Sequence, residues 1–208
     1  MKKIVVVDIG ISNLLSIKNS LEFCGAEVII TNKKKIIENT DKLVLPGVGA
    51  FHKAISNINK LGLKKVLIKH CNNKDKFFLG ICLGMQLLFD RSYENGHFKG
   101  LGIIKGSINK IPGKKEKLKI PHVGWNKVKV INPKKSVLFT NIKDLSFFYF
   151  VHSYYACNKY NKNIIGSTKY GNFTFPSVVS LNNVYGIQFH AEKSSKNGLS
   201  LLKNFINL

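Results

Sequence analysis

The chain has 208 residues, of which 44% are hydrophobic and 21% charged, and its formal net charge is +22 at pH 7. No apolar run approaches the roughly 20 residues that cross a bilayer, and the four cysteines show neither a CxxC pair nor a metal-ligand spacing. These features exclude a helical membrane protein and a disulfide-rich scaffold, so we expect a single domain over residues 1–208 with free thiols and with neither metal nor cofactor.

The strong positive charge points to a nucleic acid or an anionic membrane as a partner, but the residue types argue against both. Arg91 is the only arginine, and lysine supplies the rest of the positive charge. Arginine makes the bidentate contacts that phosphates and bases favour. The lysine clusters Lys33–Lys35 and Lys114–Lys115 are therefore expected on solvated loops or helix ends. A basic, non-catalytic binding protein stays open as the less favoured alternative.

The N-terminal half of the chain alternates short β-branched segments with helix-like segments, the order of a parallel sheet covered by helices. Its first segment is basic and then apolar, like a signal peptide, but the apolar run is short and Asp8 ends it. We therefore interpret this segment as a strand and expect a cytoplasmic protein. The predicted strands of this half are Lys3–Ile9, Glu27–Thr31, Lys42–Leu45 and Phe77–Ile81.

Helices are predicted between these strands. Ser12 is a suitable N-cap for a helix that runs to about Cys24, where Gly25 ends it. A second helical stretch covers Gly49–Asn72 and is interrupted near Gly62. Right-handed crossovers between parallel strands place such helices on both faces of the sheet.

After Gly100 helical periodicity is weak, and turn residues separate short apolar segments, which indicates antiparallel pairing. The segment Ser195–Leu208 gathers its apolar residues on one helical face and is predicted as a helix. The whole pattern predicts an α/β fold with a parallel core, antiparallel additions and helices on both faces. The predicted strands of this half are Gly102–Ile111, Gly124–Ile131, Ser136–Thr140, Phe147–Ala156 and Val184–Phe189.

The most informative segment is Gly80–Gly84, which follows a predicted strand and precedes the helix-compatible run Leu87–Phe89. A strand that turns sharply into a helix between small residues raises the intervening side chain, here Cys82, clear of the backbone. The N-terminus of the following helix favours a thiolate at this position. Cys82 is therefore the candidate nucleophile.

A candidate base follows the last predicted strand, in the segment Gly186–Ser194. Ligands bind at the carboxyl ends of the strands in α/β sheets. At that edge His190 could take the proton of Cys82 and later deliver one to the leaving group. Glu192 would hold the imidazole in the required tautomer.

A third segment, Pro46–Gly49, reaches the same edge. Its glycines allow the N–H of Val48 to complete an oxyanion hole with the N–H of Leu83. Taken alone, each of the three segments has a plainer interpretation: a turn with a buried cysteine, a strand-exit turn and a surface His-Glu pair. Together, each behind an apolar strand, they favour an active site.

The segments Gly80–Phe89 and Gly186–Ser194 resemble the class-I, triad-type glutamine amidotransferases, whose glutaminase domain releases ammonia from glutamine. The resemblance implies the flavodoxin-like sheet of that family and a triad of Cys82, His190 and Glu192. It also implies that Val48 is the residue whose amide rotates into the oxyanion hole on activation.

Three further segments, Pro46–Phe51, Pro121–Asn126 and Tyr149–Tyr154, resemble the glutaminase subunits of imidazole glycerol phosphate synthases, which act in histidine biosynthesis. This resemblance implies a heterodimer with a cyclase subunit, a (β/α)8 barrel that receives the ammonia and forms imidazole glycerol phosphate and AICAR. A glutaminase that serves another synthase, such as a paralogue in surface-polysaccharide amidation, stays open because it shares the chemistry.

The same resemblance assigns further residues to the substrate and the partner. Trp125 could instead belong to the core, since tryptophan is usually buried, and Gln86 could be a solvated polar residue. The residues implied beside or around glutamine are Gly49, Gln86, His152, Ser153 and Tyr154, and those implied to face the cyclase are Asn13, Trp125 and Lys193.

Two positions depart from the pattern of the family. Ala191 stands where proline usually separates the two catalytic residues, which could loosen the loop by up to about 1 kcal/mol. The loop Gly10–Asn13 lacks the second glycine often seen there, which could alter docking to the partner.

Overall fold

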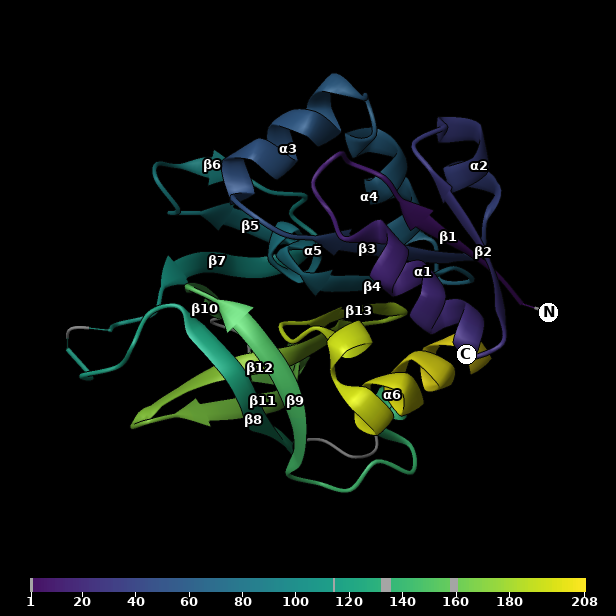
Figure 1. Cartoon of the computed structure of the whole chain (residues 1–208). Coiled ribbons are helices and arrows are strands. Elements are labelled where there is room, and N and C mark those ends of the chain that lie inside the picture. Colours follow the sequence, from purple (N-terminus) through teal and green to yellow (C-terminus); the bar gives the residue numbers. More distant parts are fainter. Residues whose placement is uncertain (1, 114, 132–135, 158–160) are drawn as a thin grey trace.

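The computed structural model describes residues 2–113, 115–131, 136–157 and 161–208. Its centre is a parallel sheet with the strand order β2-β1-β3-β4-β13 (Figure 1). These strands are rich in β-branched and other apolar residues, as expected for a sheet that is covered on both faces. Their bounds are Lys2–Val7 (β1), Ala26–Thr31 (β2), Lys42–Gly47 (β3), Phe77–Cys82 (β4) and Val184–Ile187 (β13).

Among the described residues, antiparallel strands extend this sheet beyond β13 to nine strands, and a separate four-stranded sheet lies beside it. The extension follows the order β12-β11-β8-β9, and the second sheet follows the order β10-β7-β5-β6. The bounds are Phe89–Ser92 (β5), Phe98–Lys99 (β6), Ile104–Lys110 (β7), His122–Val130 (β8), Ser146–His152 (β9), Tyr154–Cys157 (β10), Ile164–Tyr170 (β11) and Phe173–Leu181 (β12).

Helices cover both faces of the parallel core (Figure 1). In β1, Val5 and Val7 pack into the apolar cluster that holds α2, α3 and α4, whereas Ile4 and Val6 pack into the cluster that holds α1 and α6. This alternation is the period-2 pattern of a strand buried on both sides. The bounds are Leu14–Phe23 (α1), Lys34–Asn39 (α2), Phe51–Lys60 (α3), Lys64–Asn72 (α4), Leu83–Leu87 (α5) and Ser195–Asn207 (α6).

The elements predicted for the N-terminal half are confirmed, with strand ends that differ by one or two residues. The predicted cap of α1 is wrong. Asn13 is the N-cap and its Oδ1 accepts the N–H of Ser16 (3.4 Å), whereas the Ser12 hydroxyl donates to the carbonyl of Pro46 (3.0 Å). Helix α2 was not predicted, and Lys114, part of a predicted surface cluster, lies outside the described residues.

Two strand predictions for the C-terminal half are wrong. Ser136–Thr140 contains a short 3-10 helix, Val137–Phe139, closed by a hydrogen bond from the N–H of Phe139 to the carbonyl of Ser136 (2.7 Å). Phe147–Ala156 is two strands, β9 and β10, because the chain leaves the first sheet for the second at Ser153.

The helix after the elbow is also shorter than the apolar run suggests. Helix α5 ends at Leu87, and Phe89 begins β5, where it is buried and pairs with Ile104. Strands β11 and β12 were not predicted. Within the described residues, no helix is both long and apolar enough to cross a membrane.

Candidate active site

The turn from β4 into α5 has the geometry of a strained elbow. Cys82 has φ 53° and ψ −107°, a backbone conformation that is costly for a residue with a side chain. Glycine at position 84 makes the turn compatible with packing, since a Cβ there would lie 1.8 Å from the carbonyl oxygen of Leu45 in β3. The fold therefore holds the Cys82 side chain, with 7% of the residue exposed, at the carboxyl edge of the sheet.

The loop after β13 carries His190 to the same edge. Ile187 pairs with Ile81, so His190 and Cys82 follow neighbouring parallel strands. The His190 N–H donates to the carbonyl of Tyr149 in β9 (2.9 Å). The Ser194 hydroxyl donates to the His190 carbonyl (2.6 Å) and accepts the N–H of Tyr149 (2.9 Å). These bonds fix the loop to β9 although Ala191 replaces the usual proline.

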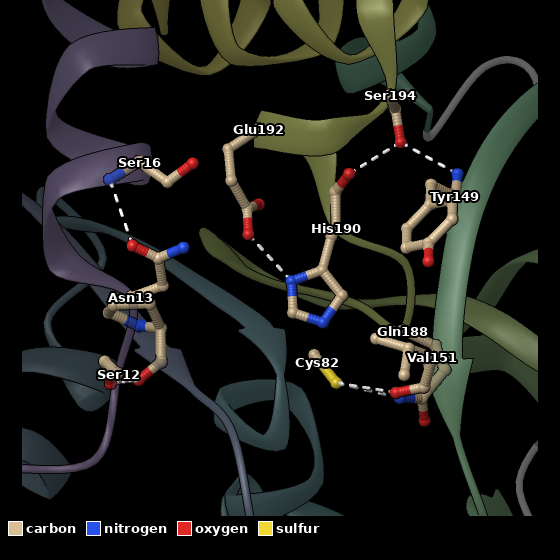
Figure 2. Close-up of polar contacts among 11 residues, drawn as sticks. Ser12, Asn13, Ser16, Cys82, Tyr149, Val151, Gln188, His190, Glu192 and Ser194 are labelled. Carbon is tan, nitrogen blue, oxygen red and sulfur yellow. Dashed lines mark hydrogen bonds and ion pairs between the residues drawn. The ribbon is translucent and has the colours of Figure 1, made fainter. Parts of the chain in front are cut away.

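The side chains of Cys82, His190 and Glu192 lie in a row (Figure 2). Nδ1 of His190 lies 2.7 Å from Oε1 of Glu192, and both side chains are buried. The other ring nitrogen, Nε2, is buried and is on the side of the ring toward Cys82. Its geometry meets the criteria for a hydrogen bond with none of the described residues. Burial alone would lower the pKa of His190, but interactions with Cys82 and Glu192 outweigh it and raise this pKa to about 10. The raised pKa favours an imidazolium at position 190 at neutral pH.

A cavity of about 330 Å³ opens beside Cys82. Its walls come from the elbow, the segment after β3 and the chain between β9 and β10, and this size suits a small polar molecule rather than a polymer. The residues predicted around the substrate all line it: Gly49, Gln86, His152, Ser153 and Tyr154, together with Val48 and Leu83.

The two predicted oxyanion donors differ in whether their backbone N–H groups are already hydrogen-bonded. Leu83 is the first residue of α5, where helical N–H groups have no partner within the helix. The N–H of Val48 is instead occupied, because it donates to the carbonyl of Ile11 (3.1 Å). The oxyanion hole as predicted is therefore not assembled in this structure, and it requires the bond to Ile11 to break.

Comparison with known proteins agrees with this geometry. The model of the family described as glutamine amidotransferase class-I matches residues 5–208. The chain is a member of this family.

Relatives of similar length fall within one group of these amidotransferases. The chain is 45% identical to the imidazole glycerol phosphate synthase subunit HisH of Aquifex aeolicus, over 97% of this chain and 94% of that protein. It is also 45% identical to the subunit of the same name from Pyrococcus furiosus, over 100% of both chains.

Solved structures share the fold at much lower identity. A crystal structure of a glutamine amidotransferase superposes with a TM-score of 0.75 at 15% identity, covering 98% of this chain and 99% of that one. The structure of PurLQS from Thermotoga maritima gives a TM-score of 0.71 at 17% identity, covering 99% and 98%.

Within this amidotransferase, His152 and a neighbour on β8 form a buried pair. Nδ1 of His122 lies 3.0 Å from Nε2 of His152, and Nδ1 of His152 lies 2.8 Å from the carbonyl oxygen of Tyr154. Both ring nitrogens of His152 are thus engaged with protein groups, although the ring lines the cavity. Burial lowers the pKa of His122 to about 4 and that of His152 to about 3, so both rings are neutral at pH 7.

Mild acid should therefore destabilise the protein. Unfolded histidine binds a proton below about pH 6.5, whereas folded His122 and His152 stay neutral to much lower pH. Their contribution to the free energy of unfolding is therefore present above pH 6.5 and is lost as the pH falls. Between pH 7 and pH 5 this linkage costs about 2 kcal/mol of unfolding free energy per histidine. The pKa of His190 is raised, so the contribution of this residue to the free energy of unfolding is complete below pH 6.5 and is lost only as the pH rises toward 10. Urea unfolding at pH 7 and pH 5 measures the difference.

Two variants serve as controls for this measurement. His97→Gln, at an exposed position, should show the same loss of stability between pH 7 and pH 5 as the unmodified protein. His122→Phe removes one of the buried rings whose pKa is lowered and should reduce the loss by about 2 kcal/mol. An unfolding free energy that is equal at the two pH values would contradict the linkage.

Two residues of the site were not predicted from the sequence. Glu94 lines the cavity, where its Oε2 accepts the N–H of Phe51 (2.8 Å). It lies in the loop after β5, and no sequence pattern marks it. Gln188 is fully buried, and its Nε2 lies 3.7 Å from Sγ of Cys82. Its position two residues before His190, at the end of a predicted strand, was a signal that could have identified it.

The three residues predicted to face a partner all lie at the surface. Asn13 and Lys193 are exposed and line a cavity of about 20 Å³ with His190 and Glu192. Trp125 is 51% exposed, so it does not belong to the core. Trp125 lies in β8 opposite Tyr149 of β9. The exposed apolar residues of these two strands, here called the β8–β9 apolar face, are Val123, Trp125, Phe147 and Val151.

Proposed function

We propose that the chain is the glutaminase subunit of an imidazole glycerol phosphate synthase. In this role it hydrolyses glutamine and passes ammonia to a cyclase subunit that forms imidazole glycerol phosphate and AICAR in histidine biosynthesis in the cytoplasm. The observation that carries the proposal is the row of Cys82, His190 and Glu192 beside a cavity of about 330 Å³. The end-to-end identity to proteins named as subunits of this synthase supports the choice of partner.

In the proposed mechanism, the thiolate of Cys82 attacks the carboxamide carbon of glutamine. Backbone N–H groups of Leu83 and, after it rotates, Val48 bind the oxyanion that forms. The imidazolium of His190 protonates the leaving nitrogen, ammonia departs, and a thioester to Cys82 remains. His190 then removes a proton from water, which attacks the thioester and releases glutamate.

The cavity wall offers groups for the rest of glutamine. The carboxylate of Glu94 suits the α-ammonium group, since it lines the cavity and carries the opposite charge. Both N–H groups of the Gln86 amide are engaged, with the carbonyl of Tyr154 and with Gln188 (3.1 Å each), so Gln86 can bind substrate only through Oε1. Because the His152 ring is engaged too, contact from that segment comes from Ser153 and from backbone groups.

A partner that covers the site would keep ammonia from water. Free ammonia is protonated in neutral water and is then no nucleophile. The β8–β9 apolar face adjoins the cavity, since Val151 belongs to both. An exposed apolar surface at the mouth of an active site is a usual sign of a docking partner. We assign this face, with Asn13, Trp125 and Lys193, to the (β/α)8 barrel of the cyclase subunit in a heterodimer.

The test is glutamate release from glutamine by the purified chain, alone and with the cyclase subunit plus its nucleotide substrate. We expect slow release alone, because Val48 is bonded to Ile11, and a rise of at least about 100-fold in the loaded complex. The cyclase subunit without its nucleotide is the control. A chain with intact Cys82 that this partner does not stimulate would serve another synthase, such as one in polysaccharide amidation.

A further inference from the structure

A continuous series of hydrogen bonds connects β8 with the sulfur of Cys82. It begins at Asn126 and passes through His122 and His152 to the carbonyl of Tyr154. That carbonyl also accepts from Nε2 of Gln86, which in turn donates to Oε1 of Gln188. Nε2 of Gln188 then donates to Sγ of Cys82, at 3.7 Å. The carbonyl of Tyr154 is thus the point at which two series of bonds meet.

This carbonyl determines which atom faces the sulfur. A backbone carbonyl can only accept, so the Gln86 atom that faces it must be Nε2. The same Nε2 lies 3.1 Å from the Gln188 amide, which must therefore present its oxygen there. The remaining end of the Gln188 amide is Nε2, a donor, and it points to Cys82. If the Gln188 amide were flipped, its Nε2 would face Nε2 of Gln86, and two donors would oppose each other. The fold therefore excludes the acceptor Oε1 from the position beside the sulfur.

The other side of the carbonyl is determined in the same way. Nδ1 of His152 must carry the proton that Tyr154 accepts, so Nε2 accepts from Nδ1 of His122. Nε2 of His122 then accepts from Nδ2 of Asn126, and this assignment agrees with the bond from the same Nδ2 to the carbonyl of Lys169 (3.0 Å). The donors and acceptors of both series of bonds are therefore consistent, and both series hold the Tyr154 carbonyl in place.

We propose that Gln188 is a positioning residue whose side-chain Nε2–H stabilises the thiolate of Cys82. The carbonyl of Tyr154 orients this N–H through Gln86. The proposal rests on the proposed role of Cys82 as nucleophile. A hydrogen bond to a charged group favours the charged form. On the side of the sulfur away from His190, Sγ also donates to the carbonyl of Val151 (3.9 Å), which favours the protonated thiol. Without Gln188, the sulfur would face an acceptor alone on this side.

The test measures the rate at which iodoacetamide alkylates Cys82 as a function of pH, followed by mass spectrometry of the peptide that contains it. Three proteins are compared: the unmodified chain, Gln188→Glu and Gln188→Met. Glutamate is nearly the same shape as glutamine but places a carboxylate oxygen against the sulfur. Methionine fills the space without a donor. The titratable groups that line the cavity with Cys82 are His190, which is paired with Glu192, and His152, Tyr154 and Glu94, and all are unchanged in the three proteins.

Both variants should move the midpoint of the alkylation profile upward, by about one pH unit for Gln188→Met and further for Gln188→Glu. A role in packing alone predicts the reverse order, with the near-isosteric glutamate closest to the unmodified protein. If the alkylation profile of folded Gln188→Met protein coincided with that of the unmodified protein, the proposal would be overturned. The result for this variant also decides the test if Gln188→Glu does not fold.

Ser177→Ala is the matched control. Ser177 is fully buried, and its carbonyl accepts the backbone N–H of Gln188 (2.9 Å). Its hydroxyl makes no hydrogen bond with any of the described residues. This variant should leave the alkylation profile unchanged. Alkylation requires neither glutamine nor a partner, so a shifted profile in a chain that hydrolyses no glutamine would overturn the proposed function and leave the role of Gln188 in place.

Discussion

Replacing Cys82 by alanine should lower the rate of glutamate release by at least about 10³-fold, because the proposed thioester cannot form without the sulfur. The loss should appear in kcat and should persist when the cyclase subunit and its nucleotide are present. Glutamine binding should change little, since the cavity wall contributed by Gln86 and Glu94 is intact. Glutamate release under saturating glutamine measures the first effect, and calorimetric titration with glutamine measures the second.

Cys24→Ser is the matched control for this variant. Cys24 is a half-buried free thiol whose Sγ donates to the carbonyl of Leu199 (3.4 Å), and a serine hydroxyl can make the same bond. It lies at the end of α1, away from the carboxyl edge of the sheet, so its rate should equal that of the unmodified protein. Turnover by Cys82→Ala near the normal rate would refute the proposed mechanism.

The elbow was predictable because its cause is local. A strand, a glycine on either side and a short helix are adjacent in the chain, and the strained φ of Cys82 follows from that order. The position of His190 was predictable for a related reason, since two parallel strands end at one edge of the sheet. The β-branched strands of the parallel core likewise carry their own signal.

The antiparallel additions were harder to predict because their sequences contain residues that usually interrupt strands. Gly166 lies at a register irregularity in β11, and Pro176 lies in β12 opposite Ser167. Proline within a strand normally argues against a paired strand. The pairing of these strands is decided by the sheet around them and not by their own residues.

The contacts of Gln188 could not be derived from the sequence at all. The residues joined by the bonds from Gln86 to Gln188 and from Gln188 to Cys82 are 102 and 106 positions apart in the chain. The same holds for Ile11, whose carbonyl occupies the N–H of Val48. Such bonds depend on side-chain and backbone directions that only the packed structure determines.

Replacing Glu192 by glutamine should lower kcat by roughly 10²- to 10³-fold and leave KM nearly unchanged. Glu192 is not part of the cavity wall, so its effect must act through His190. The amide can still accept from Nδ1 of His190, but it carries no charge and can also present a donor there. The imidazolium then loses the charge of one of the two partners that raise the pKa of His190, and the tautomer that accepts from Cys82 is no longer enforced.

The pH dependence distinguishes this effect from simple misfolding. The pKa of His190 is about 10 in the unmodified protein, and loss of the carboxylate must lower it, since burial then opposes the charge with less compensation. The alkaline limb of the kcat profile should therefore move toward neutral pH in Glu192→Gln. Glu192→Asp keeps the charge on a shorter side chain and should recover part of both kcat and the alkaline limb. Glu27→Gln, which removes only an exposed ion pair with Lys3 (3.8 Å), should change neither. An unaltered alkaline limb in folded Glu192→Gln protein would show that this carboxylate does not control the charge of His190.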